Sequence, residues 1–75
     1  MSVPEMLAVE TEREEDGRWI AEIPAIPGIL AYGGTPEEAR ARAEALALRV
    51  MAERREHGDA VPEIAGLFVN ARTPA

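Results

Sequence analysis

The sequence predicts an α+β domain in which one long helix lies across a small antiparallel sheet, with the elements in the order β-β-β-α-β. Three observations lead to this prediction. Residues 6–12 and 19–24 alternate between two faces, with the period of a strand that buries one of them. A helix-start signal covers residues 35–38 and precedes a long helical pattern, and an apolar run over 64–71 favours a last strand.

The first two strands are expected to form a hairpin. In Met6–Glu12 and again in Trp19–Pro24, the odd-numbered residues form one face and the even-numbered residues the other. Asp16-Gly17 between them is a strong hairpin signal, because glycine tolerates positive φ. We therefore expect the two segments to pair antiparallel.

A turn and a short third strand are expected next. Pro24 lacks an N–H and so ends the second strand. Pro27-Gly28 suits the centre of a type II turn, because proline presets φ and glycine takes the positive φ. Ile29–Tyr32 is the expected third strand, and Gly33-Gly34 closes it.

The helix start has every part of a capping motif. Thr35 is the expected N-cap, Pro36 stands at N1, and Glu38 at N3 completes a capping box. Such a cap contributes about 1 kcal/mol. The helix is expected to run to about His57, with Gly58 at the C′ position.

Two apolar stripes run along this helix. The stripe expected to pack on the sheet consists of Ala39, Ala43, Leu46, Ala47 and Val50. Almost opposite lies a second one, formed by Ala41, Ala45, Leu48 and Ala52. Charged residues separate the stripes, with spacings that allow i,i+4 ion pairs between Glu38 and Arg42 and between Arg40 and Glu44.

The rest of the chain completes a single domain. A loop follows the helix, and Ile64–Ala71 is the expected last strand, with residues 71–75 as a tail. We expect residues 1–75 to form one domain with its core over about 6–70. With 75 residues and no cysteine, such a domain depends on good packing or on oligomerisation.

An oligomer is expected because one helix covers only one face of a sheet. The other face must meet water or a partner, and contiguous apolar patches mark interfaces. The candidate interface residues are Met6, Ala8, Ile20, Leu48 and Phe68. We expect a homo-oligomer, a dimer or tetramer, that buries the open sheet face, the Leu48 face of the helix or a strand edge.

Composition narrows the classes of partner. The formal net charge is −6, and all 8 basic residues are Arg. Nucleic-acid binding draws its affinity from neutralised phosphates, so no direct binding of DNA or RNA is expected. An acidic surface suits a basic partner, or it serves solubility. The scarcity of thermolabile residues, with no Gln or Cys and a single Asn, is typical of a heat-adapted source. Such sources usually gain Lys, which is absent here, and a GC-rich genome explains the Arg bias equally well.

Targeting and membrane segments are not expected. Residues 1–20 show no basic stretch followed by an apolar run, which a secretory signal peptide requires. No stretch approaches the ~20 apolar residues of a membrane span. The sequence therefore favours a cytoplasmic protein.

No catalytic, cofactor or metal site is expected. His57 suits a helix C-terminus, where its charged form is favoured. The adjacent carboxylates of residues 14–16 lie in an exposed turn, and the glycines form no phosphate-binding pattern. An enzyme acting on RNA would need a convergent acidic metal cluster, and we do not expect one.

One set of residues stands along the chain in an order that is typical of a known family: Gly17, Trp19, Pro24, Ile26, Pro27, Gly28, Gly33, Thr35, Glu38, Ala39, Gly58 and Pro62. This order resembles the N-terminal domain of the HicB family of antitoxins. In that family a Gly-aromatic-apolar strand enters a Pro-Asp-Leu-Pro-Gly turn. A Gly-x-Thr and Glu-Glu-Ala helix start follows, and then a Glu-x-x-Gly…Pro exit. The likeness extends over about Leu7 to Pro62.

The resemblance implies oligomerisation and binding to a small basic RNA-cleaving toxin, HicA, which would be neutralised by occlusion of its active surface. The alternative is an orphan HicB-like oligomeric interaction domain without a toxin partner. Ala25 departs from the family, which usually has Asp there. Many members also carry a C-terminal DNA-binding module, which residues 71–75 are too short to supply, so operator binding is not expected.

Overall fold

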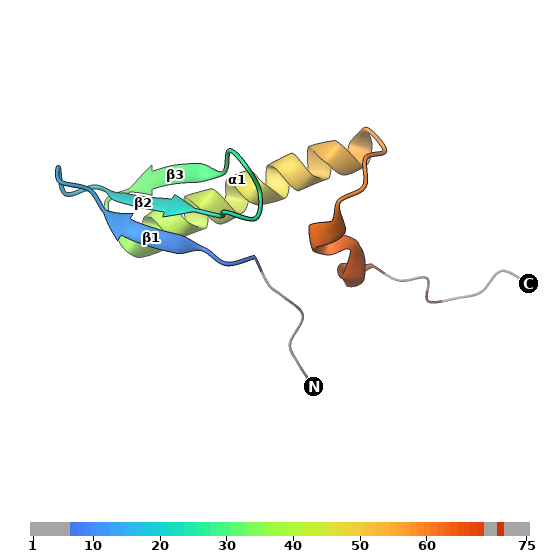
Figure 1. The fold of residues 1–75 in the computed structure, drawn as a ribbon, viewed down its shortest axis with the longest axis horizontal. Helices are drawn as coiled ribbons and strands as arrows, with labels where there is room; N and C mark the ends of the chain where they lie inside the picture. The colour runs from blue at the N-terminus through green and yellow to red at the C-terminus, as the bar shows by residue number, and fades with distance from the viewer. Residues whose placement is uncertain (1–6, 69–70, 72–75) are drawn as a thin grey trace, which may run out of the picture.

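A computed structural model of the protein describes residues 7–68 and 71. Its elements are β1 (Glu10–Arg13), β2 (Trp19–Glu22), β3 (Leu30–Gly33), α1 (Pro36–Glu56) and η1, a 3-10 helix over Pro62–Leu67. The strands form an antiparallel sheet in the order β1-β2-β3, and α1 crosses one of its faces (Figure 1). The predicted α+β class is confirmed.

The β1–β2 hairpin turns where the sequence predicts it. The Glu14 N–H donates to the Arg18 carbonyl at 2.7 Å, and the Gly17 N–H donates to the Glu14 carbonyl at 3.0 Å. Gly17 has φ +92°, the positive value that closes a three-residue hairpin loop. β1 is shorter than predicted and begins at Glu10, while Met6 lies outside the described residues.

Two consecutive turns connect β2 to β3. The Ile26 N–H donates to the Ile23 carbonyl at 3.0 Å, and the Ile29 N–H donates to the Ile26 carbonyl at 3.3 Å. A proline stands at the second position of each turn, and Gly28 has the predicted positive φ, +87°. The three-residue spacing brings all three isoleucines into the core, where each is at most 5% exposed.

The N-terminus of α1 is capped as predicted, with one difference. The Glu38 N–H donates to Thr35 Oγ1 at 3.0 Å, which satisfies one free backbone donor of the first turn. Glu38 Oε1 accepts from the Gly34 N–H at 2.9 Å, one residue before the cap rather than from the cap itself. The reciprocal bonds still tie the helix start to the end of β3.

The C-terminus of α1 is closed by a Schellman motif. The Asp59 N–H donates to the Arg54 carbonyl at 2.9 Å, and the Gly58 N–H donates to the Arg55 carbonyl at 3.0 Å. Gly58 has φ +83°, which confirms its predicted C′ position. The helix ends at Glu56, one residue before the predicted end.

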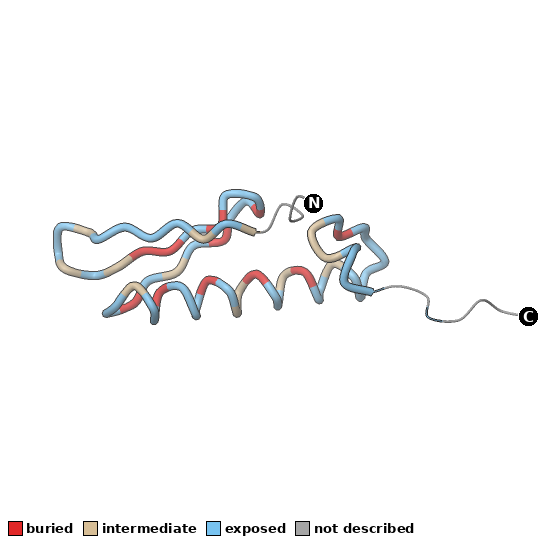
Figure 2. Tube along the Cα trace, turned by 90° about the horizontal axis from the view of Figure 1, so that it is seen from below, coloured by how far each residue is buried: buried red, intermediate tan, exposed pale blue. Residues whose placement is uncertain are grey.

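Small side chains form most of the contact between α1 and the sheet. Figure 2 shows the buried positions of α1 turned towards the strands, and they recur every fourth residue: Ala39, Ala43, Ala47 and Met51. In β2 they meet Ala21, which is fully buried. Leu46 and Val50, predicted for this face, are half-buried against the core, and Met51 continues the series towards η1.

Both predicted ion pairs on α1 are confirmed. Arg40 Nε lies 2.8 Å from Glu44 Oε2, and Arg42 Nη2 lies 3.3 Å from Glu38 Oε1. Arg42 Nη1 also donates to the Tyr32 carbonyl at 2.9 Å. Since β3 is an edge strand, the Arg42 side chain occupies a backbone carbonyl that a strand of another chain could otherwise pair with.

The predicted strand over Ile64–Ala71 is wrong over the residues that form η1. Pro62 suits the first turn of a helix, and the Ile64 N–H donates to the Val61 carbonyl at 3.1 Å. These local bonds satisfy the backbone without a neighbouring strand. Phe68 is extended, with φ −123° and ψ 122°, but residues 69–70 lie outside the described part of the chain.

Candidate protein-binding surfaces

The face of the sheet opposite α1 is formed by even-numbered residues. In β2, Ala21 is buried against the helix, so Ile20 and Glu22 on either side of it face away. The register places one residue of β1 and one of β3 beside each of them. This surface, termed the outer sheet face, consists of two rows: Glu12–Ile20–Tyr32 and Glu10–Glu22–Leu30.

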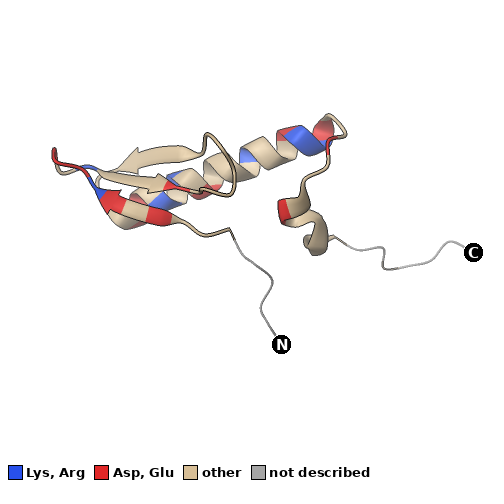
Figure 3. Ribbon diagram, viewed as in Figure 1, with Lys and Arg blue, Asp and Glu red and all other residues tan. Residues whose placement is uncertain are grey.

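One side of the outer sheet face is acidic. Glu10 lies directly opposite Glu22 in the antiparallel pair, and Glu12 follows on β1, which carries the red carboxylate colour in Figure 3. Like charges directly opposite each other destabilise a sheet. The ion pairs found among residues 7–68 and 71 involve none of the three. Such a surface is suited to a cationic partner.

The other side of the outer sheet face is apolar. Leu30 and Tyr32 on β3 are 41% and 37% exposed, and Ile20 beside them is 9% exposed. Ile20 lies outside the core cluster, so neighbours on the outer sheet face cover it rather than α1. Apolar area beside charges of one sign is typical of a surface that binds a partly apolar partner of opposite charge.

A guanidinium already lies against this apolar side. The Arg18 guanidinium carbon is 4.4 Å from the centroid of the Tyr32 ring, a cation–π geometry. Arg18 also donates to Asp16 from its backbone N–H at 3.0 Å and from Nε at 2.7 Å. These bonds, the backbone one first, hold the pKa of Asp16 below its usual 3.8, against a smaller opposing effect of desolvation. The hairpin turn is thereby tied to β3.

A second surface lies on the far side of α1. Leu48 is 61% exposed there, in the predicted stripe with Ala41, Ala45 and Ala52. Because α1 packs on the inner face of the sheet, this stripe and the outer sheet face lie on opposite sides of the molecule.

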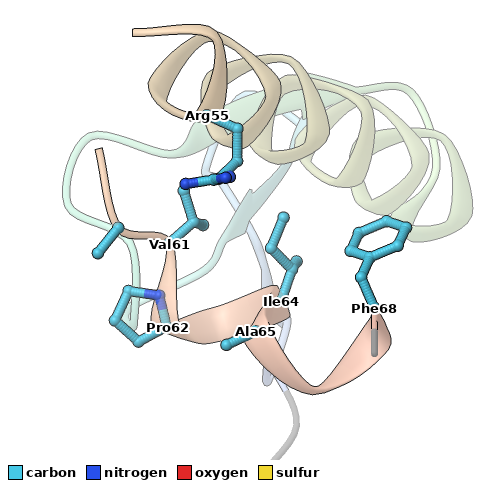
Figure 4. Close-up of a pocket in the computed structure, with 7 residues that line it drawn as sticks. Arg55, Val61, Pro62, Ile64, Ala65 and Phe68 are labelled. Atoms are coloured by element: carbon cyan, nitrogen blue, oxygen red, sulfur yellow. The ribbon is translucent and has the colours of Figure 1, made fainter. Parts of the chain in front are cut away.

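A third surface is a hollow of about 730 Å³ between the end of α1 and η1 (Figure 4). Apolar side chains make most of its wall: Ala60, Val61, Pro62, Ile64, Ala65 and Phe68. Arg55 stands beside them and donates to the Asp59 carbonyl at 3.0 Å. Leu67 and Phe68 are 72% and 75% exposed, the most exposed of the large apolar side chains described.

The predicted interface residues fall on different surfaces. Met6 lies outside the described residues, and Ala8 is exposed just before β1. Ile20 lies on the outer sheet face, Leu48 on the far side of α1, and Phe68 at the hollow. The prediction missed the carboxylates of β1 and β2 beside Ile20. The sequence shows that these carboxylates are all at even-numbered positions and so lie on one face of their strands. It does not show the strand register that places Glu10 opposite Glu22.

The family-motif residues all serve the fold. Trp19 packs against the core, and Pro24 and Pro27 lie in the two turns before β3. Gly28 supplies a positive φ, and Gly33, Thr35 and Glu38 make the passage from β3 into α1. These residues hold the sheet, its turns and the helix start in place, and Pro24 also lines a hollow beside β1.

No reacting groups converge in the described residues. His57 Nδ1 lies 2.8 Å from the Glu53 carbonyl, so the ring is engaged at the helix end. Across residues 7–68 and 71 no three side chains of His, Asp or Glu gather as metal ligands. In the same part of the chain, no helix has the length and apolar character needed to cross a membrane.

Comparisons with known protein families, curated proteins and solved structures gave no match. The HicB-like order of residues is therefore a hypothesis that depends on the sequence alone.

Proposed function

We propose that this chain is a HicB-like, non-enzymatic antitoxin-type domain whose outer sheet face binds and occludes a small basic HicA-like RNA-cleaving toxin. The observation that carries the proposal is the pairing of Glu10 with Glu22 beside the apolar side of the outer sheet face. This arrangement weakens the isolated sheet and is relieved by a cationic partner. The order of family-motif residues and the net charge of −6 support the same conclusion.

Occlusion needs no chemistry from this chain. A toxin that cleaves RNA must present cationic groups to phosphates, and those groups are what the carboxylates of the outer sheet face would pair with. Opposite charge steers the encounter and speeds association, while buried apolar area slows dissociation. The proposal includes a cytoplasmic setting, because RNA is the substrate to be protected there.

The test is direct binding between the purified chain and a small basic HicA-like protein encoded beside it, and the lack of such a neighbour would count against the proposal. We expect a 1:1 or higher-order complex by calorimetry, protection of RNA from cleavage, and weaker binding as salt rises. The double variant Glu10→Gln/Glu22→Gln should bind more weakly, and Arg40→Gln/Glu44→Gln on α1 should not. The absence of binding, or equal binding by both variants, would refute the proposal.

A second candidate is an oligomeric interaction domain without a toxin partner. The observation that favours it is the exposure of Leu48, Leu67 and Phe68 away from the outer sheet face. A homo-oligomer would bury such side chains in a dimer or tetramer. Light scattering at micromolar concentration tests this, and a monomer would rule it out. Filter binding with RNA and DNA is expected to show no direct nucleic-acid binding.

A further inference from the structure

β1 lies at one edge of the sheet and β3 at the other, because the strand order is β1-β2-β3 (Figure 1). A strand at an edge presents a row of backbone N–H and C=O groups that can pair with another extended chain. All residues of β1 are exposed. The two edges differ in how far other side chains cover their backbone groups.

The backbone groups of β1 that point away from β2 belong to its odd-numbered residues. The Glu14 N–H donates to the Arg18 carbonyl at 2.7 Å, so these two residues form a hydrogen-bonded pair next to the hairpin turn. Hydrogen-bonded positions alternate along an antiparallel pair, so in the same register the even-numbered residues of β1 bond to β2. The N–H and C=O groups of Thr11 and Arg13 therefore point outwards from the sheet.

The edge of β3 is partly occupied, whereas the edge of β1 is open. On β3, the Tyr32 carbonyl accepts from Arg42 Nη1 at 2.9 Å. On β1, no hydrogen bond within residues 7–68 and 71 reaches the outward backbone groups of Thr11 or Arg13. Because a strand pairs through such groups, β1 has the edge to which a further strand can add.

Glutamates on β1 restrict which strand can be added. Glu10 and Glu12 both lie on the outer sheet face. Antiparallel neighbours place outward-bonding residues opposite one another, so two copies of β1 paired over Glu10–Arg13 would set the glutamates of one against those of the other. Like charges directly opposite each other destabilise a sheet. The edge of β1 is therefore unsuited to pairing with the β1 of a second copy.

An extended segment with a basic residue at every second position complements this edge. Its backbone would bond to the outward groups of Thr11 and Arg13. Its basic side chains, two residues apart, would lie beside Glu10 and Glu12 on the outer sheet face, where opposite charges stabilise a pair of strands. In strand addition the backbone bonds supply affinity, and the alternate side chains select the sequence.

We propose that the open edge of β1 binds an extended basic segment of the partner as an additional antiparallel strand, with cationic side chains beside Glu10 and Glu12. The assignment rests on the proposed function for the identity of the partner. The added strand would widen the outer sheet face on its acidic side. The edge itself makes a prediction that does not need the partner, because a short basic peptide is expected to bind there.

The probe is the acetylated and amidated peptide Thr-Arg-Thr-Arg-Thr, titrated into the purified chain and followed by the backbone amide NMR signals. We expect shifts centred on Thr11 and Arg13, and slower exchange of their amide hydrogens with solvent. The isomer Thr-Arg-Arg-Thr-Thr carries the same charge, but its adjacent arginines lie on opposite faces of a strand. It should bind about two- to fivefold more weakly, the effect of losing one cross-strand ion pair.

Methylation of the peptide backbone tests the direction of the hydrogen bonds. N-methylation of the central threonine removes a donor to β1 and should weaken binding about tenfold. N-methylation of an arginine is the matched control, because its N–H points away from β1, and it should leave binding unchanged. On the protein, Glu12→Gln should weaken binding about two- to fivefold, whereas Glu44→Gln on α1 should not.

The outcomes separate this inference from the proposed function. A peptide that fails to bind at millimolar concentration, shifts confined to β3 or α1, equal binding of the isomer, or equal effects of the two methylations would overturn the edge assignment. Thr11→Pro removes an outward N–H at a position where an edge strand tolerates proline. If this variant binds the basic partner with full affinity, the edge assignment fails while the proposed function stands. If the peptide adds to β1 but no basic partner binds, the proposed function fails while β1 remains an edge that accepts a basic strand.

Discussion

Gly33 at the end of β3 and Ala39 in the first turns of α1 approach so closely that a Cβ added to Gly33 would lie 2.5 Å from the Ala39 nitrogen and 3.0 Å from its Cα. The obstacle is backbone, which a side-chain rotation cannot clear. This approach sets the position of α1 on the inner face of the sheet. Because α1 covers the inner face alone, the outer sheet face stays uncovered by the helix.

Gly33→Ala should therefore destabilise the domain by about 1–3 kcal/mol, the usual effect of overpacking. Gly34→Ala is the matched control, because a Cβ there would meet Glu38 Oε1 at an ordinary 3.9 Å. Urea unfolding followed by circular dichroism measures both. Equal midpoints for the two variants would contradict the close approach of β3 and α1.

The cap of α1 gives a second stability prediction. Thr35→Ala removes the acceptor of the Glu38 N–H and should lower the free energy of unfolding by about 1 kcal/mol. Thr35→Ser retains the hydroxyl and should keep most of that stability. The same urea midpoints serve as the measurement. If serine proves as harmful as alanine, the hydroxyl is not what caps the helix.

The like-charged pair on the outer sheet face predicts opposite effects on stability and binding. Glu22→Gln removes the repulsion with Glu10 and should raise the free energy of unfolding by less than about 1 kcal/mol, because both side chains are exposed. The same variant should weaken binding of a basic partner, because the charge that attracts it is lost. Glu15→Gln, in the hairpin turn, controls for net charge. A Glu22→Gln variant that is both less stable and a tighter binder would contradict this account.

The elements that the sequence predicts well are those with local causes. The turn at Gly17, the cap at Thr35 and the helix end at Gly58 each depend on residues within a few positions of one another. Their signals are complete in the sequence. For that reason the hairpin and the helix start lie where the sequence places them.

Features that depend on distant residues were missed or predicted wrongly. The apolar run from Ile64 to Ala71 resembles a strand, but a strand needs a neighbour, whereas Pro62 begins a local 3-10 helix. Glu10 lies opposite Glu22 only because of the register between two strands. The hollow of about 420 Å³ has walls from three separate segments of the chain. No pattern within one segment contains that information.

The hairpin turn gives a pH prediction. Because the pKa of Asp16 is lowered in the folded state by the Arg18 N–H and guanidinium, the Asp16 carboxylate stabilises the fold above its usual pKa of 3.8. That contribution disappears as the pH falls through the lowered value. The effect should be modest because both side chains are exposed.

The measurement is the urea midpoint of wild type and Asp16→Asn between about pH 5 and pH 2. The two proteins should differ at the upper pH and converge at the lower one. In an Arg18→Met background, which removes the side-chain partner, the Asp16→Asn difference should shrink. A difference that stays constant over the whole range would show that Asp16 contributes no pH-dependent stability.

The proposed homo-oligomer, if it forms, has a surface that can be identified with two variants of equal charge. Phe68 borders a concave apolar hollow of about 730 Å³, whereas Leu48 stands on a convex helix face among alanines that offer little area. Concave apolar surface buries more of a partner's side chains, and the hydrophobic gain grows with the buried area. Phe68→Glu should therefore shift the oligomer towards monomer in light scattering at micromolar concentration, and Leu48→Glu should leave its mass unchanged. Dissociation by Leu48→Glu alone would move the interface to the far side of α1, and dissociation by neither would leave the outer sheet face as the surface that copies of the chain share.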